Sequence, residues 1–152
     1  MAGKKSSWLR GAGLAAITGS RTALGPALVC RSAVKSAPLR ACAYVASALE
    51  LVGDKLPRTP NRTAPLGLVL RIVSGAGVVR ALVRRGRRRE RGSSAGALLL
   101  GAAAAVLGAF AGLRLRVALT RRLGGGPRAS AIAGAIEDAA LLLIGTRLAP
   151  TR

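Results

Sequence analysis

Apolar residues occur along this chain in five long runs, separated by short segments rich in charge, proline or glycine. The runs cover approximately Gly11–Cys30, Pro38–Gly53, Pro65–Val83, Ser93–Leu113 and Ala129–Ala149. A helix that crosses a hydrocarbon layer of ~30 Å needs about 20 predominantly apolar residues, and most of the runs approach that length. The pattern predicts an all-α fold, a polytopic membrane helical bundle formed by residues 11–149 as one domain, with short tails at 1–10 and 150–152.

The first run differs from the fourth, whose neighbourhood Gly92–Leu113 contains 22 consecutive uncharged residues. Arg21 and Pro26 interrupt the first run. Five full spans would also place the basic N-terminus on the side opposite the basic Arg84–Arg91 loop, against the tendency of such loops to stay cytoplasmic. We therefore expect four transmembrane helices plus a re-entrant or broken N-terminal segment, with five spans as the alternative.

The connecting segments contain helix-terminating residues. Asp54–Pro65 includes three prolines and predicts that the second helix stops near Leu56. Thr63 can cap the next helix, with Pro65 in its first turn. Gly124–Pro127 predicts a turn between the last two helices.

The composition supports helices packed closely in lipid. Hydrophobic residues make up 51% of the chain but aromatics only 2%, and there are 20 glycines. Small residues let helix backbones approach each other, and Gly108 and Gly112 match the small-xxx-small spacing, so we predict that they pack helices. The net charge of +20 also allows a soluble nucleic-acid binder, but the neutral 92–113 stretch favours a lipid bilayer as partner. No nucleic acid is expected.

The sequence contains few residues of the types that catalyse reactions or bind metal ions. The chain has no histidine and only two cysteines, Cys30 and Cys42, so no metal or other cofactor is predicted. No phosphate loop, dinucleotide fingerprint or nucleophile motif is present, and we expect a protein that is not an enzyme.

The basic Arg84–Arg91 loop has two interpretations. It is either a signal that fixes topology or a site for anionic lipid headgroups, and the first is preferred. The arginines available to headgroups are Arg84, Arg85, Arg87, Arg88, Arg89 and Arg91.

Four of the five acidic residues lie in or beside apolar runs, where an unpaired charge costs at least ~2.5–3.5 kcal/mol. Glu50 and Asp54 are one helical turn apart, so either cations lie nearby or one of the two acids takes up a proton. Glu137 and Asp138 are adjacent, so we expect one to face the bundle interior and the other a neighbouring helix or a cleft. The predicted intramembrane charged cluster is Glu50, Asp54, Lys55, Arg21, Arg71, Arg114, Glu137 and Asp138.

This cluster predicts either a site for passage of a small ion or polar solute, or salt bridges that only fix helix order. The alternative function is a non-catalytic membrane scaffold that packs through its glycine faces, and the chain is also compatible with a homo-oligomer.

Several motifs resemble small bacterial integral membrane proteins grouped as domain of unknown function 4126. The most specific is Glu50-Leu-Val-Gly-Asp-Lys-Leu-Pro-Arg-Thr-Pro-Asn-Arg-Thr, followed by Arg71-Ile-Val-Ser-Gly-Ala. Gly19-Ser-Arg21 with Pro26, Gly112-Leu-Arg-Leu-Arg116 and Ala135-Ile-Glu-Asp-Ala139 also resemble that family, in the same order. The resemblance implies a multi-pass helical protein of the bacterial plasma membrane without assigned activity. The basic Arg84–Arg91 loop departs from the family pattern.

Overall fold

The described part of the chain is helical throughout. The computed structural model describes residues 2–33, 36–53, 65–86 and 94–149. These residues form six α-helices and no strand: α1 (Ala2–Ser20), α2 (Leu24–Ala33), α3 (Ala37–Gly53), α4 (Pro65–Gly86), α5 (Ser94–Arg122) and α6 (Gly126–Leu148). The all-α prediction is confirmed, and α4 begins at Pro65 as predicted.

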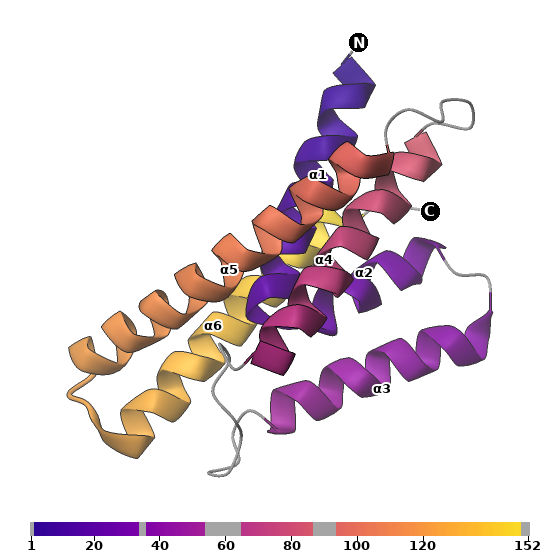
Figure 1. Cartoon of the computed structure of the whole chain (residues 1–152). Coiled ribbons are helices and arrows are strands. Elements are labelled where there is room, and N and C mark those ends of the chain that lie inside the picture. The colour runs from indigo at the N-terminus through magenta and orange to yellow at the C-terminus, as the bar shows by residue number, and fades with distance from the viewer. Residues whose placement is uncertain (1, 34–35, 54–64, 87–93, 150–152) are drawn as a thin grey trace.

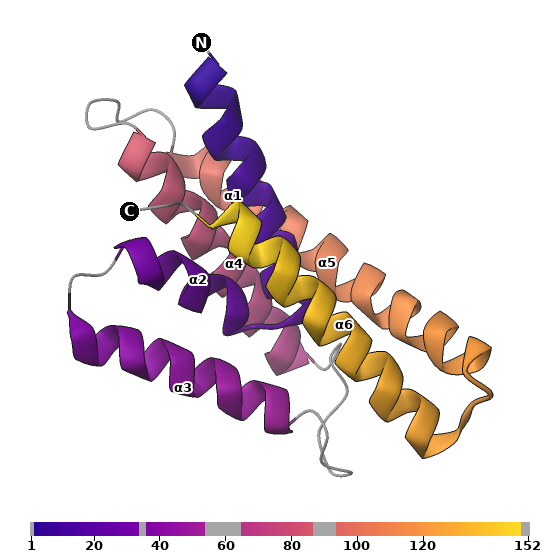
Figure 2. The ribbon, with the colours of Figure 1, turned by 180° about the vertical axis from the view of Figure 1, so that it is seen from behind.

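The first apolar run is not one helix but two, α1 and α2, joined by a break at residues 21–23 (Figures 1 and 2). The last helical bond of α1 is donated by the Arg21 amide to Ile17 at 2.8 Å, and the chain re-enters a helix where Ala27 donates to Ala23 at 2.9 Å. Pro26 lies in the first turn of α2, where its missing N–H costs nothing. The predicted break is present at residues 21–23, and Pro26 follows it inside the first turn of α2.

Helix α1 lies at the centre of the bundle and packs against α4, α5 and α6. It begins at Ala2, so the basic residues expected to form a separate tail at 1–10 belong to this helix. From Gly11 to Ser20 its residues are buried or half-buried. The segment predicted to be re-entrant or broken is broken, and its first helix is the central element of the fold.

The helices approach closely because glycines face each other or face alanines. A Cβ on Gly108 of α5 would lie 2.7 Å from the carbonyl carbon of Ala16 in α1 and nearer still to its oxygen. A Cβ on Gly75 of α4 would lie 2.8 Å from the carbonyl oxygen of Gly101 in α5. Real Cβ atoms do not come this close, so α1, α4 and α5 can pack at these separations only with glycine.

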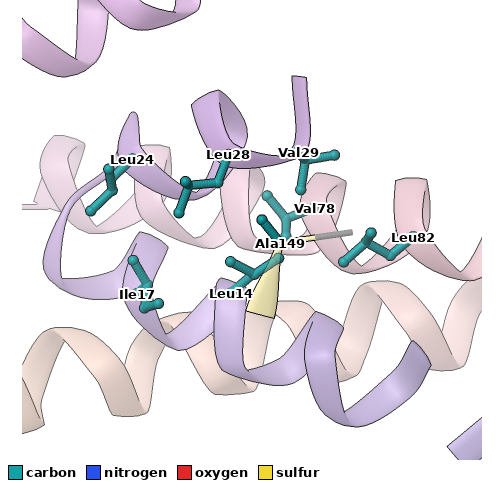
Figure 3. Packing of buried hydrophobic residues seen from close by; sticks show 8 residues of the cluster. All are labelled: Leu14, Ile17, Leu24, Leu28, Val29, Val78, Leu82 and Ala149. Carbon is teal, nitrogen blue, oxygen red and sulfur yellow. The ribbon is translucent and has the colours of Figure 1, made fainter. Parts of the chain in front are cut away.

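Larger side chains fill the space between α1, α2 and α4. The cluster contains Leu14, Ile17, Leu24, Leu28, Val29, Val78, Leu82 and, from the end of α6, Ala149 (Figure 3). Leu14 of α1 is completely buried, and Leu28 of α2 also contacts the position of Gly145 in α6. This cluster holds α2 against the bundle and so fixes the break that precedes it.

Three of the described helices are long and apolar enough to cross a membrane: α4 over Pro65–Arg84, α5 over Ala95–Arg122 and α6 over Gly126–Leu148. Only about a third of each spanning window is buried inside the bundle, at 39%, 33% and 33%. Large apolar side chains cover the outside, as at Leu66, Leu99 and Leu107, which are 73%, 71% and 70% exposed. Such a surface is compatible with a membrane protein.

The remaining predicted span, α3, is shorter, at 17 residues, and packs mainly against α2. Its outer surface is apolar, with Leu39, Val45 and Leu49 more than half exposed. Four spans therefore remain a prediction.

Helix α5 continues to Arg122, well past the end of the predicted apolar run at Leu113. The predicted glycine turn follows, and Gly124, Gly125 and Gly126 have φ angles of 90°, 73° and 84°. Only glycine adopts this conformation readily, so the turn directs α6 back along α5.

Candidate functional site

A buried ion pair joins the break in the N-terminal segment to α6. The Arg21 side chain donates from Nε to Oδ1 of Asp138 at 2.8 Å, and its Nη2 donates to the same oxygen. The Arg21 side chain is 2% exposed and that of Asp138 is 11% exposed. Two donors on one carboxylate oxygen in a water-poor setting form a strong charge-assisted contact, and removal of either partner would leave a buried charge uncompensated.

The same break binds a second carboxylate, that of Glu50 on α3. The backbone amide of Thr22 donates to Glu50 Oε1 at 2.6 Å, and that of Ala23 donates to Oε2 at 2.7 Å. These two amides precede α2 and have no helical acceptor, because the helical bonds of α2 start further along. Glu50 thus supplies from another helix the cap that the sequence around the break lacks.

Charges of opposite sign meet the two helix ends at the break. Arg21 follows the last turn of α1, where carbonyl groups carry partial negative charge, and Glu50 meets the first turn of α2, where amides carry partial positive charge. Glu50 therefore stabilises the start of α2 directly, and the positive charge of Arg21 is favourable beside the end of α1. The interruption of a central helix is made tolerable by this arrangement.

Glu137 is buried beside Asp138 but faces a different neighbour. It is 3% exposed, and a Cβ on Gly112 of α5 would lie 3.1 Å from its Oε1. Ser20 reaches the same place, since its hydroxyl donates to the Gly108 carbonyl at 3.0 Å and also lies against Gly112. The absent side chain of Gly112 makes room for a carboxylate and a hydroxyl between α1, α5 and α6.

The arginine that α5 brings near these acids is Arg116. A Cβ on Gly134, one turn before Asp138 on α6, would lie 2.9 Å from Nη2 of Arg116 and 3.2 Å from its Cζ. Arg114, the predicted counter-ion, is instead exposed. The two positions are two residues apart and so point to different sides of the helix. Arg71 of α4 is buried, at 6% exposed.

The site lies at the middle of the longest apolar helices. Eleven residues separate Glu137 from each end of α6, and fourteen separate Gly108, the acceptor of the Ser20 hydroxyl, from each end of α5. At 1.5 Å per residue Glu137 is therefore about 16 Å from either end of its helix. If α6 spans a bilayer of ~30 Å, its two acids lie near the midplane, where charge is most costly.

The predicted cluster is thus divided by the structure. Arg21 and Asp138 are brought into contact, with Glu137 next to them on α6 and Glu50 at the following backbone amides. Asp54 and Lys55, the predicted partners of Glu50, lie outside the described residues, as do Arg87, Arg88, Arg89 and Arg91 of the basic loop. Helix α4 includes Arg84, which is exposed, and Arg85.

Sequence reasoning missed three contributors: the Thr22 and Ala23 amides, the Ser20 hydroxyl and Arg116. The amides could have been found, because a break before Pro26 leaves unpaired N–H groups that need an acceptor. Chemically, the arrangement can hold negatively charged groups at a helix break. Among the described residues, no three His, Cys, Asp or Glu side chains gather in a way that would hold a metal ion.

Comparisons with known proteins add no relatives: no protein-family model matches the chain, and no curated protein or solved structure matches it.

Proposed function

We propose that this protein is a multi-pass membrane protein that passes or exchanges a small ion or polar solute at the break between α1 and α2. The observation that carries the proposal is the buried Arg21–Asp138 pair at the centre of α6. Ionisable groups at that depth are rare in membrane helices and commonly mark the path of an ion or other solute.

The broken central helix supports the same conclusion. Transporters commonly bind solutes near the midplane at discontinuous helices, whose ends offer backbone groups and dipoles to the solute. Here the break offers two backbone amides, one guanidinium and the Ser20 hydroxyl within a few residues. A bundle that needed only helix order could achieve it with the glycine contacts already present between α1, α4 and α5.

The scaffold alternative has less support. Gly108 and Gly112, the positions predicted to pack against another helix, face Ala16 and Ser20 of the same chain. These glycines are therefore occupied inside the bundle and do not offer a face to a partner. We keep the non-enzymatic role, the bacterial plasma membrane and membership of the domain of unknown function 4126 family as parts of this proposal.

The test is solute flux in proteoliposomes containing the purified chain. Liposomes with the wild-type protein would be compared with empty liposomes for uptake of sodium, rubidium, chloride and phosphate. Gly77→Ala is the matched control, because no atom lies within 4 Å of the position of its added Cβ. We expect uptake of at least one solute with the wild type and Gly77→Ala, and its loss in Arg21→Gln. Uptake of none, or unchanged uptake in Arg21→Gln, would refute the proposal.

A further inference from the structure

We propose that the solute is a small anion and that the Arg21 guanidinium is the group that recognises it. The Asp138 carboxylate binds Arg21 when no solute is present, and the anion takes its place at the guanidinium. The inference rests on the proposed function and extends it by naming the chemical class of solute.

The first support is that the break already binds two negatively charged groups. Three consecutive residues hold two carboxylates: Arg21 through its side chain, and Thr22 and Ala23 through their amides. Each carboxylate comes from a different helix, Asp138 from α6 and Glu50 from α3. The segment is therefore built as a receptor for anionic groups, and the chain itself supplies the two that occupy it.

The chemistry of arginine sets the class of ligand. Its guanidinium keeps its charge at any physiological pH and presents planar N–H donors that match a carboxylate or a phosphate. Arg21 lies at 2% exposure, away from competing water, so a small anion that reached it would meet little solvent screening. Since only one oxygen of Asp138 receives the two donated bonds, one anionic oxygen is enough to satisfy this geometry.

The balance of buried charge argues against a cation. The described buried charges are two arginines, Arg21 and Arg71, and two acids, Glu137 and Asp138. A cation site of carboxylates needs an excess of negative charge, whereas every added cation here would meet two fixed positive charges. The half-buried groups Arg40, Arg116 and Glu50 add two positive charges and one negative charge, so the described buried and half-buried charges have an excess of one positive charge.

The exposed charges at both ends of the bundle would draw anions inward. In the last two turns of α4 the exposed side chains include Arg80 and Arg84, and Arg10 is exposed near the middle of α1. At the α5–α6 turn they include Arg121, Arg122 and Arg128. The three described acids, by contrast, are buried or half-buried. Charge of one sign around an entrance raises the local concentration of the opposite ion over roughly a Debye length of 8–10 Å.

A rescue experiment tests whether Arg21 can take an external anion. Asp138→Ala removes the resident carboxylate and leaves room beside the guanidinium. Sodium formate should then raise the melting temperature of the purified variant in detergent, with saturation. It should leave Arg21→Leu/Asp138→Ala unaffected. Glu137→Ala is the matched control, because it removes the adjacent acid of α6 and leaves the Asp138 carboxylate in place beside Arg21. No rise, or an equal rise in the double variant, would overturn the proposal.

Flux through the wild-type chain provides the second test, and its comparison of anions with cations needs no variant. Proteoliposomes would be loaded for counterflow of radiolabelled chloride, phosphate and malonate, and separately of sodium and rubidium. We expect counterflow of at least one anion and of neither cation, with a loss of at least about tenfold in Arg21→Gln. Counterflow of cations alone would overturn the anion inference while leaving the proposed function standing. Counterflow of neither class would overturn both.

Discussion

Breaking the Arg21–Asp138 pair should cost much more stability than its two hydrogen bonds suggest. Asp138→Asn keeps the shape of the side chain but removes its charge, so the Arg21 guanidinium, 2% exposed, is left without the carboxylate that it contacts. Breaking a buried pair by removing one partner typically costs about 3–5 kcal/mol, because the remaining charge is neither solvated nor paired. We expect a loss in this range for Asp138→Asn and also for Arg21→Gln.

The assay is reversible unfolding of the purified protein in mixed micelles. The fraction of denaturing detergent is increased, and the loss of helix content is measured by circular dichroism. The double variant Arg21→Met/Asp138→Leu should recover most of the loss, because neither charge is then buried. The coupling energy from the double-mutant cycle should therefore be larger than about 2 kcal/mol. Arg114→Gln, an exposed arginine of α5, is the control and should change stability by less than about 0.5 kcal/mol. Single losses below about 1 kcal/mol, or additive ones, would refute this view of the pair.

Three further perturbations follow from the same packing. Gly108→Ala should destabilise the bundle by about 1–3 kcal/mol, because the added methyl group would force α5 away from Ala16 of α1. Gly77→Ala, whose added Cβ meets nothing within 4 Å, should be neutral or stabilising in the same unfolding assay. Glu50→Ala should cost about 1–2 kcal/mol by uncapping α2, with Glu50→Gln closer to wild type; equal losses would contradict a capping role. Gly125→Ala should cost about 1 kcal/mol because its φ is 73°, although no atom lies near its Cβ, and an unchanged unfolding midpoint would contradict this.

Much of the fold was visible in the pattern of apolar runs. The helix positions from α3 to α6 follow the runs closely, because proline and glycine segments end them and because apolar length is a strong signal for helices in lipid. The end of α5 did not follow from that pattern. Its last turns carry several arginines, such as Arg121 and Arg122, and charge on an exposed turn does not stop a helix.

The central position of α1 could not be read from its sequence. Lys4, Lys5 and Arg10 make the segment look peripheral, yet the residues after them are small enough to be surrounded by other helices. Burial of a helix depends on which neighbouring helices can pack against it. The close backbone contacts at Gly19, Gly75 and Gly108 follow from the three-dimensional arrangement of the helices and not from the sequence of α1.

The sequence identified several residues of the site but not which of them contact each other. Arg21 and Asp138 stood out because a charge inside an apolar run needs compensation, but 117 residues separate them and no spacing rule connects them. Glu50 accepts from the amides at the break, which the sequence did not suggest, and Asp54, its predicted neighbour, lies outside the described residues. Arg116 rather than Arg114 approaches α6, and the choice depends on the rotation of α5, which its arginine spacing alone does not fix.

The most direct test of the central claim is the depth of the site in a bilayer. Ile136 is next to Glu137, is 47% exposed and points away from the bundle, so a nitroxide label there reports the depth of the acids without touching them. The label would be placed on Ile136→Cys in a Cys30→Ala/Cys42→Ala background reconstituted in liposomes. The account predicts a label near the bilayer centre, relaxed strongly by oxygen and hardly by a water-soluble nickel complex. Strong relaxation by the nickel complex would contradict a charged pair at the midplane.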